Sequence, residues 1–218
     1  MSRPARRGAR LRDDGFTILE LSIATLVLGI MLTIATGALI SLQNATARTN
    51  AMISIEQNAS TTLAQMARDI RSAHSITFVS PTTNAAYSVV LNINQPTGGT
   101  IPVEWVYQPP AAPATVGTLS RVMLTHSLAA SATNVLLTDV ANGTTPVFSY
   151  FNLAGGSSMP TTGSTAIQTL QNCTTAIGVN LTISPAPVPG VSAFSESDRV
   201  AITDQQQLLS ANENYQCG

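Results

Sequence analysis

The stretch that decides the fold runs from Asp14 to Ala47 and reads DGFTILELSIATLVLGIMLTIATGALISLQNATA. After Glu20, the 27 residues from Leu21 to Ala47 carry no charged side chain. At about 1.5 Å per helical residue this run extends roughly 40 Å, whereas the hydrocarbon core of a bilayer is about 30 Å thick. The sequence therefore predicts a membrane-spanning helix.

The residues before this run are strongly basic. All ten basic residues of the chain are arginine. Five of them lie in this segment: Arg3, Arg6, Arg7, Arg10 and Arg12. Basic segments beside a membrane helix stay on the cytoplasmic side, so the C-terminal part is expected outside. The whole chain has a net charge of -1, which argues against a nucleic-acid-binding surface. The absence of lysine excludes Schiff-base and Walker-type lysine chemistry.

Three ordinary interpretations of this N-terminus compete. Ala45-Thr46-Ala47 has the small-residue form of a secretory cleavage site, but the apolar run before it is longer than the roughly 7–15 residues of such signals. Arg6-Arg7 suggests a twin-arginine signal with little further support. An uncleaved signal anchor fits the apolar run but leaves Glu20 unexplained. A carboxylate beside lipid is costly, so it is expected to have a function.

The junction Gly15-Phe16 with Glu20 four residues later, between a basic leader and an uninterrupted apolar run, resembles type IV prepilins and the pseudopilins of type II secretion. The resemblance implies that prepilin peptidase cuts between Gly15 and Phe16 and methylates the new amine of Phe16. It also implies that Glu20 neutralises the N-terminal amine of a neighbouring subunit. In the alternative, Glu20 reaches the lipid headgroups or pairs with its own Phe16.

A second helical pattern follows the apolar run. Its apolar positions are spaced by three and four residues, as on one face of a helix: Met52, Ile55, Ala59, Leu63, Met66 and Ile70. We therefore expect one helix from about Thr17 to about Ala73. The predicted organisation is a leader (1–15), a transmembrane or filament-core half-helix (16–47), an amphipathic half-helix (48–74) and an extracytoplasmic β-rich head (75–218).

The head has short β-like runs separated by Gly, Pro, Asn and Thr. The expected strands are Ile76–Val79, Tyr87–Ile93, Val103–Tyr107, Leu119–Thr125, Asn134–Val140, Pro146–Phe151, Ala176–Ile183 and Arg199–Thr203. One long helix followed by a largely antiparallel sheet is an α+β arrangement, and the resemblance makes it pilin-like. Arg68-Asp69-Ile70-Arg71 and Phe148-Ser149-Tyr150-Phe151 are similar to segments of PilW-like minor pilins and J-type pseudopilins.

The only two cysteines, Cys173 and Cys217, both lie in the part expected outside the cell. An oxidising location favours a disulfide between them over two free thiols. Closing a loop of about 45 residues is worth roughly 4 kcal/mol in the chain-entropy model.

No catalytic, cofactor or metal-binding residues are assigned. Asp198 and Asp204 flank a short strand and are either solvated loop charges or part of a calcium site. We expect a non-enzymatic filament subunit in the inner or plasma membrane. Its expected partners are prepilin peptidase, other pilins or pseudopilins, an assembly platform and lipid, with no small-molecule substrate. The alternative is an extracytoplasmic binding module or enzyme held by an uncleaved anchor.

Overall fold

A computed structural model describes residues 17–77, 84–96, 98–152, 164–184 and 193–202 of the chain. The residues divide into two compact units, Met1–Ala47 and Arg48–Gly218. One helix, α1, runs from Ile18 to Arg71. The expected long helix is therefore confirmed, although it ends slightly earlier than predicted because the first strand begins at Ala73.

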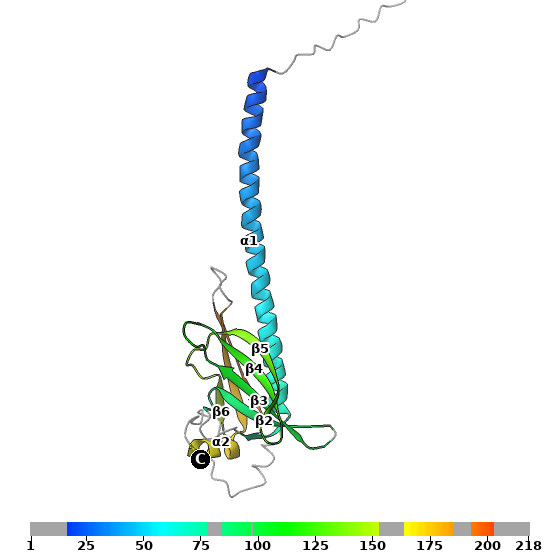
Figure 1. Cartoon of the computed structure of the whole chain (residues 1–218), viewed down its shortest axis with the longest axis vertical. Coiled ribbons are helices and arrows are strands. Elements are labelled where there is room, and N and C mark those ends of the chain that lie inside the picture. The colour runs from blue at the N-terminus through cyan, green and yellow to red at the C-terminus, as the bar shows by residue number, and fades with distance from the viewer. Residues whose placement is uncertain (1–16, 78–83, 97, 153–163, 185–192, 203–218) are drawn as a thin grey trace, which may run out of the picture. The chain divides into compact units, whose positions relative to one another are not determined.

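The head is built on a mainly antiparallel sheet (Figure 1). Its strands are β1 (Ala73–Thr77), β2 (Ser88–Asn94), β3 (Thr100–Gln108), β4 (Gly117–Leu124), β5 (Ala130–Val140), β6 (Phe148–Phe151), β7 (Ala176–Ile183) and β8 (Phe194–Ala201). Their order in the sheet is β1-β2-β3-β4-β5-β7-β6, and β8 pairs with the other edge of β7. Each of the eight predicted strands overlaps one of these, so the α+β class is confirmed.

Helix α2 (Ser164–Cys173) was not predicted, because only strands were expected after Ser75. Its ten residues contain neither a charged side chain nor a proline, so the sequence gives no sharp start or stop signal. Leu170 and Cys173 are buried, and their spacing of three residues was the available helical signal.

The second half of α1 packs on the sheet through one face (Figure 1). The buried residues of this face include Ala59, Leu63, Met66 and Ile70, as the apolar spacing predicted. Ile55 is only partly buried, and Met52 is 39% exposed, so for Met52 the predicted burial is wrong. The core begins at about the level of Ile55 because Ile55 is the first α1 residue that packs against the buried cluster.

A buried carboxylate lies within the packed face of α1. Asp69 Oδ2 accepts a hydrogen bond from Trp105 Nε1 on β3 at 3.0 Å and one from Arg121 Nε on β4 at 2.8 Å. The side chains of Arg121 and Asp69 are 21% and 13% exposed, so this ion pair is largely shielded from water. Asp69 thus joins the last turns of α1 to the two central strands that they cover.

Two further buried polar side chains hold the sheet to its connections. The Tyr150 hydroxyl, fully buried, donates to the carbonyl of Ala85 at 2.7 Å, and desolvation by burial raises the pKa of Tyr150 well above its usual value. Asn142 Nδ2 donates to the Asn180 carbonyl at 2.8 Å, while Asn142 Oδ1 accepts from the Thr182 amide at 2.7 Å. Each side chain therefore replaces water with a specific backbone partner.

We predict that Asp69→Asn destabilises the head by about 2–4 kcal/mol, because Arg121 would be left largely buried without its counter-ion. Trp105 is the only tryptophan and is fully buried beside Asp69, so its fluorescence reports unfolding directly. The measurement is urea unfolding of the full chain in detergent. The matched control is Asp139→Asn, where, within the described residues, the carboxylate accepts a hydrogen bond only from neighbouring Thr138. Equal stabilities of the two variants would contradict the prediction.

Candidate functional site

The sequence places the functional residues at the start of α1. Gly15 and Phe16 lie outside the described residues, whereas Glu20 lies in the first turn of α1 and is exposed. The Glu20 amide donates to Thr17 Oγ1 at 3.2 Å, so Thr17 acts as the helix cap. A carboxylate in the first turn also interacts favourably with the helix dipole. Glu20 therefore sits where its own helix tolerates a negative charge.

Five serine and threonine side chains of the apolar run are satisfied within the helix. Their hydroxyls donate to carbonyls three or four residues earlier: Ser22 to Ile18, Thr25 to Ser22, Thr33 to Gly29, Thr36 to Leu32 and Thr46 to Leu42. In lipid, an unsatisfied polar group costs several kcal/mol, so this internal bonding makes the surface compatible with a bilayer. Within the described part of the chain, α1 is the one helix long and apolar enough to span a membrane.

The apolar run has two chemically different faces. Ser22, Thr25, Gly29, Thr33 and Thr36 recur at intervals of three and four residues and form a stripe of small side chains. Glu20 lies on the opposite side of the helix, since Gly29 is nine residues away, or two and a half turns. Gly29 has no other atom within 4 Å of where a Cβ would stand. Large apolar side chains cover the remaining surface, and all of them are exposed.

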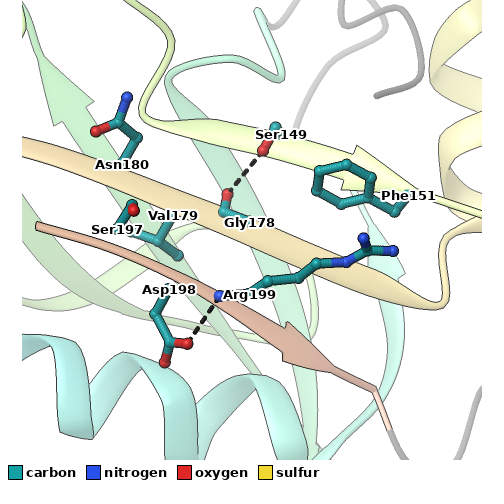
Figure 2. Close-up of a pocket in the computed structure, with 8 residues that line it drawn as sticks. All are labelled: Ser149, Phe151, Gly178, Val179, Asn180, Ser197, Asp198 and Arg199. Atoms are coloured by element: carbon teal, nitrogen blue, oxygen red, sulfur yellow. Dashed lines mark hydrogen bonds between the residues drawn. The ribbon is translucent and has the colours of Figure 1, made fainter. Parts of the chain in front are cut away.

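The head contains a shallow hollow on the sheet face opposite its core (Figure 2). It has a volume of about 400 Å³ and lies across β6, β7 and β8. Gly178 forms its floor, and a Cβ there would stand 2.5 Å from Ser149 Oγ and 2.9 Å from the Phe151 ring. The Arg199 guanidinium lies 3.9 Å from the centre of the Phe151 ring. The aromatic ring thus covers a glycine on the neighbouring strand, a packing device of β-sheets.

The remaining candidate residues are not assembled into a site. Asp198 Oδ1 accepts a hydrogen bond from the Arg199 amide at 2.8 Å, and Asp204 lies outside the described residues. Among the residues that the structure describes, no group of three or more His, Cys, Asp or Glu side chains is placed to hold a metal ion. Cys173 is buried at the end of α2, and Cys217 lies outside the described residues, so their disulfide stays a prediction.

Asp69 is the side chain that sequence reasoning missed. Its segment, Arg68-Asp69-Ile70-Arg71, was noted only for its resemblance to minor pilins and pseudopilins. The available signal was the position of Asp69 beside Ile70 on the apolar face, where an unpaired charge would be costly. Such a position predicts a partner but does not say which arginine supplies it.

Comparison with known proteins adds no relative. No protein-family model, no curated protein and no solved structure matches this chain.

We predict that Gly178→Ala destabilises the head by about 1–3 kcal/mol, because the added methyl group forces Ser149 and Phe151 to move. Thermal unfolding of the purified full chain measures this. Asn180→Ala, an exposed position on the same strand, should change stability by less than about 0.5 kcal/mol. A Gly178→Ala variant as stable as the wild type would contradict the prediction, because Ser149 and Phe151 would then not be packed tightly against Gly178.

Proposed function

We propose that this chain is a minor pilin or pseudopilin, a structural subunit of a type IV pilus, DNA-uptake or type II secretion filament. The observation that carries the proposal is the exposed, charge-free surface of α1 from Leu21 to Ala47, preceded by one carboxylate, Glu20, in the first turn. A soluble protein would bury such a surface. The surface therefore needs lipid before assembly and other subunits after it.

The resemblance to prepilins supplies the N-terminal chemistry of this proposal. Prepilin peptidase removes residues 1–15 on the cytoplasmic side and methylates the amine of Phe16, which keeps its positive charge. Glu20 of one subunit then pairs with the Phe16 amine of a neighbour as that neighbour leaves the bilayer at the assembly platform. The pairing relieves two charges that are each costly in lipid.

The small-residue stripe lets helices pack closely in a filament core. Gly29 and the self-bonded hydroxyls allow a neighbouring backbone to approach closely without leaving a polar group unpaired. Because Glu20 lies on the opposite side, one helix can contact different neighbours through different chemistry. The head, held to α1 through Asp69, follows its helix into the filament on the outer side of the membrane.

The proposed function makes a prediction about the N-terminus. Mass spectrometry of chain purified from its own cells should find a peptide that begins with N-methylated Phe16. Glu20→Gln should be processed in the same way but lower incorporation into sheared filaments about tenfold, since a pairing worth about 1.4 kcal/mol is lost. Asp139→Asn, at a position on β5 outside the proposed contacts, is the control.

An intact leader in membranes that contain active prepilin peptidase would contradict the proposal. It would favour the alternative, an extracytoplasmic binding module or enzyme held by an uncleaved anchor. Normal incorporation of Glu20→Gln would leave the processing in place but exclude the charge-pairing step.

Another prediction concerns the proposed disulfide between Cys173 and Cys217. Peptide mapping without reduction should find the two cysteines in one linked peptide. Cys217→Ser should lower the free energy of unfolding by about 2–4 kcal/mol, because a long loop of the unfolded chain is no longer closed. Quantitative alkylation of both thiols in unreduced protein would contradict the pairing.

A further inference from the structure

A groove with an acidic side chain at its centre runs beside the second half of α1. Two hollows meet at Glu56. One, of about 420 Å³, is lined by Ile53, Glu56, Gln57, Ser60 and Thr61. The other, of about 320 Å³, is lined by Glu56, Ser60, Phe194, Ser195 and Glu196. We call these eight residues of α1 and β8 the Glu56 groove.

The Glu56 groove is negatively charged and partly apolar. Glu56 and Glu196 supply two carboxylates, while Ile53 and Phe194 supply apolar surface beside them. Glu56 is exposed, and within the described residues it makes no ion pair or side-chain hydrogen bond. A ligand that suits this surface has an aliphatic stem and a cationic end, as an arginine side chain does.

An arginine of this chemistry lies two turns earlier on the same helix. Arg48 is the first charged residue after the apolar run; it is exposed and makes no ion pair or side-chain hydrogen bond within the described residues. Eight residues separate Arg48 from Glu56, or about 12 Å along the axis. Helical side chains pair over three or four residues, so Arg48 cannot satisfy Glu56 of its own chain.

The spacing along the sequence relates this pair to the N-terminal one. In both cases the cation precedes the acid: Phe16 precedes Glu20, and Arg48 precedes Glu56. Arg48 and Glu56 are eight residues apart, whereas Phe16 and Glu20 are four residues apart. A parallel neighbour displaced along the helix axis by about 12 Å would bring its Arg48 level with Glu56.

We propose that Arg48 of one copy of this chain binds in the Glu56 groove of a second copy, as a second intersubunit ion pair. The inference rests on the proposed function, because it requires parallel neighbouring subunits. The contact joins two different surfaces of the same chain, which is the kind of interface that builds an open helical filament rather than a closed dimer. Glu196 adds negative charge on the β8 side of the groove.

A charge exchange tests the pair in the full chain expressed in its own cells. Arg48→Glu and Glu56→Arg should each lower recovery in sheared filaments about tenfold, because each places like charges together. The double variant Arg48→Glu with Glu56→Arg should recover to within about threefold of the wild type, since the pair is restored in reverse. Asn50→Glu, on the other side of α1 from Arg48, is the control and should have no effect.

Three results would overturn the pair. Normal recovery of both single variants would mean that the pair does not form. A double variant recovered as poorly as the single variants would mean that Arg48 binds lipid headgroups instead. The third is loss of all wild-type chain from filaments together with an intact leader, which would also overturn the proposed function. If the wild-type chain is methylated and present in filaments, failure of the double variant to recover would overturn the ion pair alone.

Cross-linking identifies the partner as a second copy. Two differently tagged full chains, one Arg48→Cys and one Glu56→Cys, are coexpressed and treated with a short bismaleimide. The mixed dimer should exceed that from Asn50→Cys with Glu56→Cys about tenfold, because only the first pair shares an interface. Equal yields from the two pairs would overturn the assignment to a second copy and favour another pilin as the occupant.

Discussion

The carboxylate of Asp69 is the interaction on which the head depends. It accepts bonds from Trp105 on β3 and Arg121 on β4, while its own backbone belongs to α1. Apolar packing between a helix and a sheet is non-directional, so it permits several rotations of the helix. A shielded charge with two fixed donors permits one, because every other rotation leaves Arg121 or Asp69 without its counter-ion. The face of α1 that remains outside the core is thereby set.

The other carboxylates of α1 differ from Asp69 in exposure and in partners. Asp69 is satisfied within the chain, whereas Glu20 and Glu56 are exposed and make no ion pair within the described residues. An acid at a helix start is common, and a solvated acid on a helix surface is common too. Each of the two follows a cation in the sequence, Phe16 before Glu20 and Arg48 before Glu56, and Arg48 lies too far along the helix to reach its own Glu56. The filament model uses both for contacts between subunits.

The head itself offers less for small-molecule chemistry. Its hollow on β6, β7 and β8 is accounted for by Phe151 covering Gly178, with Arg199 stacked on the ring. The buried hydroxyl of Tyr150 and the buried amide of Asn142 are committed to backbone partners. These polar groups stabilise the connections between strands.

The sequence by itself determined the long helix, the α+β class and the approximate positions of all eight strands, because hydrophobic periodicity is a local property of the chain. It also singled out Glu20, since one charge at the edge of an uncharged run needs no tertiary information to be noticed. It did not predict α2, whose ten residues lack charged residues and helix breakers, nor the partners of Asp69 and Asn142. Those depend on which distant residues the sheet brings together, as does the Glu56 groove, where α1 meets a strand more than a hundred residues later in the chain. Only the tertiary structure decided them, because the register of the strands and the rotation of the helix are set by the whole core at once.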